Sequence, residues 1–438
     1  MKSKTLFSDL NSISLYRGDL LRRIFFTLIV LIFYRLGTYI PIPGINLEIV
    51  KDLFFQDSHG IFGVFNLFSG GALARMTILA LNVMPYIVAS IVMQLVSVAI
   101  KGMDKVKSNE GIGHKSMNFY IRCMTIVFCA FQAMTMLIGL EKLGDNVVIE
   151  PGIIFRLTGV FSMVGGTMLL IWLGEIITAY GIGNGISLII FTGIISELHN
   201  GLSHLLKLNK AGVSALVVLF VFLLFLLLLI LIIYVEYSYR KVNIHYPKKQ
   251  FNKVNRNNFS YIPLKINLSG VIPTIFANAM LLTPITVANF YKGSVFSDFI
   301  LHYLSPGKVL YITFYLILIV FFNFFYTNFI FNPQENANFL KKGGGFIPGI
   351  RPGKHTSEYL HGIVFKLTFI GSAYLAVICI VPEIVRYYYN VPFIFSGTSL
   401  LIIVNVITET ISQVQSYIFA NKYDNLIKKY ESKSGRLK

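Results

Sequence analysis

Residues 61–94 of the chain read IFGVFNLFSGGALARMTILALNVMPYIVASIVMQ, and this stretch decides the fold. It opens with an apolar piece of about seven residues, far below the roughly 20 that a helix needs to cross a bilayer. The piece breaks at Ser69-Gly70-Gly71, and a charge follows at Arg75. Backbone at membrane depth that is not helical survives only against protein or in a water-filled cavity. The segment is therefore either a re-entrant surface loop or a small mobile element inside a cavity, and the second interpretation indicates a pore.

The composition is that of a membrane protein. Hydrophobic residues make up 55% of the 438 positions and charged residues only 13%, whereas soluble domains carry nearer a quarter of charged residues. Several apolar runs reach spanning length, which predicts an all-α membrane protein with ten transmembrane helices. The spans are expected near residues 20–40, 75–98, 118–140, 153–174, 184–200, 213–234, 268–290, 309–331, 363–381 and 395–415.

The basic residues predict how the chain is oriented in the membrane. No small-residue cleavage site follows the first apolar run, so this run is expected to stay as a helix and not to be removed as a signal peptide. Of the 38 Lys and Arg residues, 28 fall on the side that holds both termini in the ten-span map. Because basic residues concentrate on the cytoplasmic side of membrane proteins, both termini are predicted to be cytoplasmic.

Two loops on the predicted cytoplasmic side, at 236–265 and 332–358, are too long and too basic for simple connectors. The second contains three glycines at 343–345, followed by FIPGIRPGK at 346–354. Basic loops beside a membrane can attract anionic lipid, at about 1 kcal/mol per charge. Proline and glycine, however, shape a projecting structure with turns. We therefore expect a docking surface for a soluble partner, with or without nucleic acid, rather than lipid attraction alone.

Catalytic and metal-binding motifs are weak. The run at 353–356 departs from a phosphate-binding loop, because Pro348 stands in place of its first glycine and His355 in place of the Ser or Thr. The glycines at 181, 183 and 185 have the wrong spacing for a dinucleotide site. The cysteines lack metal-ligand spacing and are expected to be small buried residues within spans: Cys123, Cys129 and Cys379. No catalytic residue, metal site or cofactor is expected.

Intramembrane charges are few: Arg35, Arg75, Glu175 near a span end, and Glu409 in the tenth span. An ion-coupled carrier usually needs more ionisable groups near the bilayer midplane. A polytopic solute transporter is nevertheless the second interpretation, and it predicts that a small substrate protects a midplane site. A lipid-linked transferase is the third, but it requires a metal–carboxylate cluster in a loop, which the sequence lacks.

Seven motifs, in order along nearly the whole chain, resemble the SecY family. Each motif alone is modest, but seven in the same order are very specific. They are GTYIPIPG at 37–44, FNLFSGGALAR at 65–75, MPYI at 84–87, WLGEIITAYGIGNGIS at 172–187, PLKINLSGVIPTIFA at 263–277, FIPGIRPG at 346–353 and GTSLLI at 397–402.

The resemblance implies two five-helix halves, related by inverted pseudosymmetry, around a central pore that opens sideways between spans two and three and spans seven and eight. The broken segment at about 61–75 would be a plug helix that seals this pore from outside. The implied domains are a cytoplasmic N-terminal segment at 1–19, an N-terminal half at 20–200, a C-terminal half at 201–415 and a cytoplasmic tail at 416–438.

The resemblance also implies three sets of site residues. The plug set is Asn66, Phe68, Ser69, Gly70, Gly71 and Arg75. The apolar pore ring is Val83, Ile87, Ile186, Ile190, Ile275 and Ile402. The docking set for a motor or a ribosome is Arg240, Lys241, Arg351 and Lys354.

The function implied is that of the channel subunit of a bacterial protein translocase. Such a subunit moves unfolded preproteins across the plasma membrane and releases transmembrane segments sideways into the bilayer. The implied partners are the small subunits SecE and SecG, the SecA motor ATPase, the ribosome, signal sequences and membrane lipid. Since the motor or the ribosome would supply the energy, the chain itself is not expected to be an enzyme.

Overall fold

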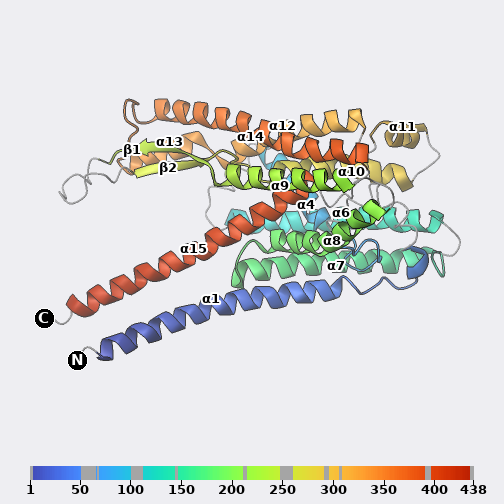
Figure 1. Cartoon of the computed structure of the whole chain (residues 1–438), viewed down its shortest axis with the longest axis horizontal. Helices are drawn as coiled ribbons and strands as arrows, with labels where there is room; N and C mark the ends of the chain where they lie inside the picture. Colours follow the sequence, from blue (N-terminus) through green and yellow to red (C-terminus); the bar gives the residue numbers. More distant parts are fainter. Residues whose placement is uncertain are drawn as a thin grey trace. The chain divides into compact units, whose positions relative to one another are not determined.

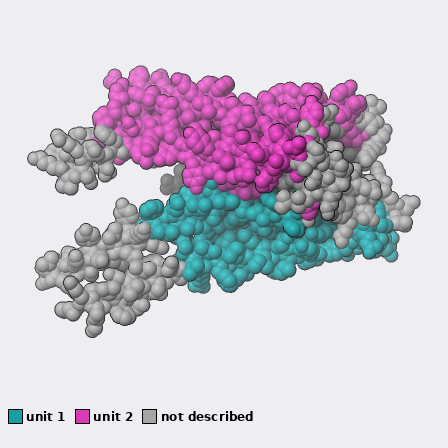
Figure 2. Space-filling model, in the orientation of Figure 1, with its two compact units in different colours: residues 1–201, 405–438 teal, residues 202–404 magenta. Residues whose placement is uncertain are grey.

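The computed structural model describes residues 3–50, 66, 69–99, 112–143, 147–210, 215–246, 260–290, 295–304, 308–389 and 396–434. The chain divides into two compact units, coloured separately in Figure 2. The first unit is residues 1–201 with 405–438, and the second unit is residues 202–404.

The first unit is helical throughout its described regular structure. Within it α6 packs against α4 and α7, and α7 also packs against α1 (Figure 1). Its helices are α1 (Ser3–Gly37), α4 (Met84–Ala99), α6 (Ile112–Leu143), α7 (Ile153–Tyr180), α8 (Gly185–Lys210) and the larger part of α15 (Gly397–Ser434).

The second unit combines helices with one antiparallel hairpin. Within it α12 packs against α10 and α14, and α13 packs against α14. Its elements are α9 (Ala215–Tyr237), β1 (Tyr239–Ile244), β2 (Ser260–Lys265), α10 (Ile272–Phe290), α11 (Val295–Tyr303), α12 (Val309–Ile330), α13 (Pro333–Lys342) and α14 (Lys354–Tyr389).

Each of the ten predicted spans coincides with a helix. Among the described residues, six helical stretches are long and apolar enough to cross a membrane, and three shorter apolar helices lie at Met84–Ser97, Gly185–His199 and Ile272–Ile285. The start predicted for the second span, residue 75, is wrong, because α4 begins only at Met84. The residues before it form turns, with left-handed backbone at Met76 (φ 43°) and Asn82 (φ 50°).

The helix surfaces are those of a protein in contact with lipid. The helix α9 is apolar all round, yet only one stripe at helical spacing is buried: Val221, Phe225, Leu228 and Ile232. Leucines on its other faces, such as Leu219 and Leu226, are exposed. A helix that is apolar on every face is stable only inside a large core or a bilayer.

One prediction about the cysteines needs correction. Cys129 and Cys379 are buried as expected, but Cys123 is exposed on α6. Its neighbours Phe119 and Val127, one turn away on either side, are exposed as well. A small apolar thiol suits such a surface when lipid covers it, so location within a span does not imply burial in protein.

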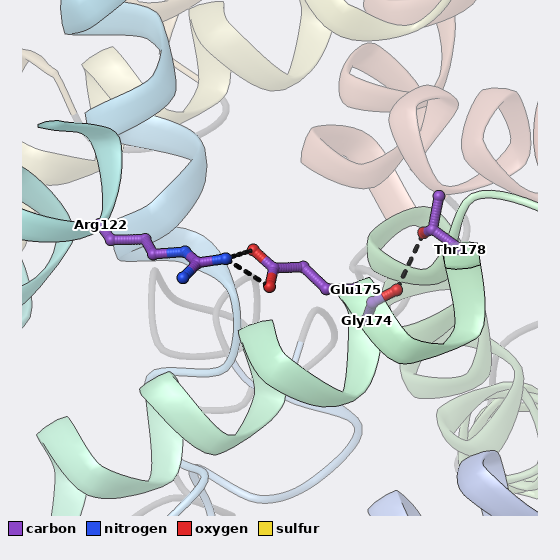
Figure 3. A network of polar contacts seen from close by, with 4 residues as sticks. All are labelled: Arg122, Gly174, Glu175 and Thr178. Atoms are coloured by element: carbon purple, nitrogen blue, oxygen red, sulfur yellow. Dashed lines mark hydrogen bonds and ion pairs between the residues drawn. The ribbon is translucent and has the colours of Figure 1, made fainter. Parts of the chain in front are cut away.

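An ion pair joins α6 to α7 in the first unit. Figure 3 shows Arg122 and Glu175 pointing toward one another, with Nη2 of the arginine 2.6 Å from both carboxylate oxygens. Arg122 lies near the beginning of one predicted span and Glu175 just beyond the end of the next. The pair therefore lies at one edge of the membrane, as expected of antiparallel neighbours.

The turn from α7 into α8 is closed by hydrogen bonds one helical turn from this pair. Thr178 donates its hydroxyl to the Gly174 carbonyl at 2.8 Å (Figure 3) and accepts the backbone N–H of Gly185 at 2.9 Å. A Cβ atom on Gly185 would lie 1.9 Å from the Gly174 carbonyl oxygen. Only glycine allows α7 and α8 to approach this closely.

A buried polar network fixes the beginning of α10 in the second unit. The Asn267 amide donates to Oε1 of Glu236 at 3.0 Å, and the Asn323 amide donates to the Thr368 carbonyl at 3.1 Å. The Ser269 hydroxyl lies between the two amide oxygens and can donate to one of them at a time. Satisfied networks of this kind specify one arrangement of the helices they join.

Two adjacent glycines in α7 give a matched test of how closely α7 packs against the backbone at Ile78 in the first unit. A Cβ atom on Gly166 would lie 2.2 Å from the Ile78 carbonyl oxygen, whereas one on Gly165 would meet nothing within 4 Å. We expect Gly166→Ala to lower the free energy of unfolding by about 1–3 kcal/mol through overpacking. Gly165→Ala should raise it by up to about 1 kcal/mol through helix propensity. Thermal unfolding in detergent measures both, and equal midpoints for the two variants would contradict the packing.

Candidate functional site

Asn66 and residues 69–75 form a compact turn held by their own side chains. The Asn66 side-chain oxygen accepts the backbone N–H of Ala74 at 2.9 Å, and its carbonyl accepts the N–H of Gly71 at 3.0 Å. The Ser69 hydroxyl donates to the Asn66 carbonyl at 3.1 Å and accepts the N–H of Leu73 at 3.1 Å. The polar side chains of the predicted plug thus satisfy the irregular backbone locally. We call Asn66 with residues 69–75 the plug turn; Leu67, Phe68 and residues 61–65 lie outside the described residues.

The plug turn is tied to the segment that follows α1. The backbone N–H of Ile42 donates to the Met76 carbonyl at 2.9 Å, and that of Ile78 donates to the Ile40 carbonyl at 3.1 Å. The backbone at 40–42 and the backbone at 76–78 therefore pair as a short antiparallel β-bridge. The pairing fixes where the chain leaves the plug turn and heads for α4.

The glycines of the plug turn are required for conformation and for space. Gly70 and Gly71 have φ of 64° and 82°, in the left-handed region that glycine adopts readily. A Cβ atom on Gly70 would lie 2.8 Å from Cα of Gly193 and 3.0 Å from Oγ of Ser196. Both glycines are buried, so the plug turn rests directly on the backbone of α8.

Two arginines flank the plug turn and share one aromatic ring. Arg35, on α1, donates from Nη1 to the Gly70 carbonyl at 2.5 Å. The Arg75 guanidinium carbon lies 4.2 Å from the centre of the Tyr39 ring, and that of Arg35 lies 5.6 Å from the same centre. A cation over an aromatic face is attracted by the electrons of the ring, and Tyr39 is 57% exposed. The predicted plug residue Arg75 is thus joined by Arg35, which the sequence marked only as an intramembrane charge.

Glu197 is a residue of this site that the sequence analysis missed. It lies on α8, one turn after Gly193, and only 6% of it is exposed. Its Oε1 would lie 2.3 Å from a Cβ atom on Gly71. The signal that could have found it is the spacing Gly193-x-x-x-Glu197, which puts a small residue and a carboxylate on one helix face.

The predicted pore residues divide between the two units. In the first unit Val83 and Ile190 are buried, while Ile87 and Ile186 are half-buried. Ile186 packs on α7, since a Cβ atom on Gly174 would meet its Cγ1 at 3.0 Å. In the second unit Ile402 is buried and Ile275 half-buried. The ring that would bring all six together remains a prediction.

The hairpin β1–β2 turns one face to protein and one to solvent. Val242, Ile244 and Leu264 are buried in a cluster that also contains Leu340, Ile347, Leu360, Ile363, Val364 and Leu367. On the other face Lys241 pairs across the hairpin with Pro263, and its ammonium lies 5.0 Å from the centre of the Tyr261 ring. Arg240 is exposed on the opposite side of the strand from Lys241, so the two predicted docking residues point in different directions.

The loop that carries Arg351 and Lys354 has a fixed backbone and free side chains. His245, after β1, exchanges two backbone hydrogen bonds with Phe346, at 2.9 and 3.0 Å. The Thr356 hydroxyl donates to the Arg351 carbonyl at 3.0 Å. Both basic side chains are exposed, and no carboxylate among the described residues forms an ion pair with them, with Arg240 or with Lys241. We call Arg240, Lys241, Arg351 and Lys354 together the basic surface; they lie on the hairpin β1–β2 and on the loop that is hydrogen-bonded to it.

Comparison with known sequences is consistent across nearly the whole chain. The SecY family model matches residues 77–411. Protein translocase subunit SecY of Rickettsia bellii is 46% identical over 423 residues, which cover 95% of this chain and 98% of the relative. The Escherichia coli subunit of the same name is 41% identical over 419 residues, covering 94% of this chain and 95% of the relative.

Solved structures share the fold at lower identity. A protein-conducting channel superposes with a TM-score of 0.65 at 19% identity, over 91% of this chain and 93% of that chain. A SecY structure whose plug domain is described as stabilising the closed state and maintaining a membrane seal gives the same TM-score and identity, over 91% and 92%. Sec61 in a canine ribosome–channel complex gives 0.65 at 17% identity, over 91% and 93%. The predicted channel fold is confirmed.

The contact between the plug turn and α8 predicts a specific cross-link. In a background without Cys123, Cys129 and Cys379, the pair Arg75→Cys and Glu197→Cys should be joined by a short, reducible bis-maleimide, because the side chains of Arg75 and Glu197 flank the same glycine, Gly71. Intact-mass measurement and peptide mapping detect the cross-link. Pairing Arg75→Cys with Leu198→Cys, an exposed position on α8, is the control. Equal yields for the two pairs would show that the plug turn does not rest on this face of α8.

Proposed function

The chain belongs to the SecY family, and we propose how its described parts serve as the channel subunit of a protein translocase. It is a multi-pass membrane protein that conducts other proteins, rather than an enzyme or the solute transporter that was the second interpretation. We propose that it moves unfolded preproteins across the membrane and releases their transmembrane segments sideways into the bilayer. The observation that carries the proposal is the buried Gly70–Gly71 turn seated on α8.

We propose that the plug turn, with Asn66, Phe68, Ser69, Gly70, Gly71 and Arg75, closes the channel at rest. Its internal hydrogen bonds support this role, because they let a short segment stay intact while it moves as a body. Its polar contacts with other elements, to Arg35 and to the face of α8, are contacts that can be exchanged. The related SecY structure described as having a sealing plug domain supports the same role.

We propose that Val83, Ile87, Ile186, Ile190, Ile275 and Ile402 form the constriction of the pore. All six are aliphatic and at least half-buried, and they come from helices of both units or the turn before α4. A narrow apolar constriction excludes water and ions when empty, because its walls are poorly hydrated. Aliphatic side chains can also give way around a passing polypeptide of any sequence.

We propose that the basic surface docks the SecA motor and the ribosome. Arg240, Lys241, Arg351 and Lys354 are exposed cations on a platform with a buried core, which supports binding to an acidic partner or to RNA. A family relative, Sec61, is known in complex with a ribosome. SecE and SecG are proposed as further subunits.

The proposed location is the bacterial plasma membrane, with both termini and the basic surface in the cytoplasm. The excess of Lys and Arg on that side supports the orientation. The relatives from Rickettsia bellii and Escherichia coli are bacterial proteins, which supports a bacterial membrane as the location.

Replacing Arg351 separates docking from lipid attraction. Arg351→Glu should slow SecA-driven export at least tenfold while the protein still inserts, because losing a charged interface contact typically costs about 2–5 kcal/mol. Lys341→Glu makes the same charge change on the same loop, at an exposed residue of α13 outside the docking set. Export is measured by protease protection of a precursor in membrane vesicles. If both variants slow export equally, the loop acts through its net charge and the docking role of Arg351 is wrong.

Polar substitutions in the pore ring should loosen the closed channel. Ile275→Asn and Ile402→Asn should raise the resting ion conductance, since a hydrogen-bonding group lowers the barrier to wetting. Leu226→Asn, at an exposed position of α9, should harm insertion without causing a leak. Conductance is measured in planar bilayers. Wild-type conductance in both ring variants would remove these residues from the pore.

A further inference from the structure

Glu197 is a carboxylate that the roles proposed above do not use. We propose that it is a positioning residue, which holds the plug turn on α8 and sets how readily the channel opens. This inference rests on the proposed function of the plug turn. It adds one residue of α8, the helix that stays in place when the plug turn moves.

The first step is geometric. Three consecutive contacts run along one face of α8: Gly193 and Ser196 lie against Gly70, and Glu197 lies against Gly71. The Glu197 oxygen comes so close that a Cβ atom on Gly71 would overlap it at 2.3 Å. The carboxylate therefore touches the backbone of the plug turn at the point where the backbone is left-handed.

The second step concerns charge. The Gly71 Cβ position that overlaps the Glu197 oxygen also lies 3.5 Å from Nη2 of Arg75, so the carboxylate and the guanidinium flank the same glycine. Nη1 of Arg75 is buried and has no hydrogen-bond partner among the described residues. Arg35 adds a second guanidinium on the Gly70 side. Glu197 is only 6% exposed, and a buried carboxylate needs a nearby cation, which Arg75 supplies.

The third step concerns the two states of the channel. Gly71 and Arg75 belong to the plug turn, whereas Glu197 belongs to α8. If the plug turn leaves α8, Arg75 separates from the carboxylate. A group that interacts with only one of two states shifts their equilibrium toward that state. Glu197 thus stabilises the closed channel, and its charge, not only its shape, is the property that matters.

The test uses the full channel complex with its small subunits in planar bilayers. Glu197→Gln keeps the size and hydrogen-bonding reach of the side chain and removes its charge. We expect its resting ion conductance to rise several-fold, and export of a precursor with a defective signal sequence to rise with it. Glu175→Gln is the matched control, because Glu175 is a half-exposed carboxylate paired with Arg122 on another helix. It should leave both readouts at wild-type values.

A second variant at Glu197 and a double-mutant cycle with Arg75 complete the test. If Glu197→Gln does not accumulate, Glu197→Asp keeps the charge but withdraws it from Gly71, and it should also leak. Combining Glu197→Gln with Arg75→Gln should raise conductance by less than the product of the two single effects, because both remove the same interaction. Wild-type conductance in the Gln or Asp variant would overturn the inference. Failure of the wild-type complex to translocate any precursor would instead overturn the proposed function.

Discussion

Backbone that is not helical cannot face hydrocarbon, and the rest of this structure depends on how the chain meets that constraint at residues 70–83. Asn66 and Ser69 satisfy the backbone of the plug turn from within. Gly70 and Gly71 then let the turn approach α8 until backbone touches backbone. A segment whose backbone is satisfied by its own side chains can be moved without unfolding, which is the property a seal requires.

The charges at this contact have a physical consequence for gating. Arg35 and Arg75 share the Tyr39 ring, and Glu197 lies across Gly71 from Arg75. Electrostatic interactions are strong where water is excluded and weaken steeply once water enters. The buried Glu197 therefore interacts with Arg75 most strongly while the plug turn covers it, and less once the plug turn leaves and water enters. Such a contact suits an element that must be either seated or displaced.

Much of the fold could be predicted from apolar runs and basic loops. The run predicted at 213–234 corresponds to α9, and the helix of every other predicted span is present. The late beginning of α4 could not be predicted, since the left-handed backbone at Met76, a residue type that rarely adopts it, depends on tertiary contacts. Glu197 was missed for a related reason: a single carboxylate near a span end looks like a solvated residue until the plug turn is known to cover it.

The most direct test of the account asks whether the plug turn must leave α8 for a protein to pass. Proteoliposomes with the channel complex that carries Arg75→Cys and Glu197→Cys, joined by a reducible bis-maleimide, would be supplied with SecA, ATP and a precursor, and protease-protected precursor would be measured before and after reduction. The account predicts that translocation is blocked while the cross-link is intact and restored when it is reduced. Translocation at the same rate in both states, with the cross-link shown to be present by mass, would contradict it.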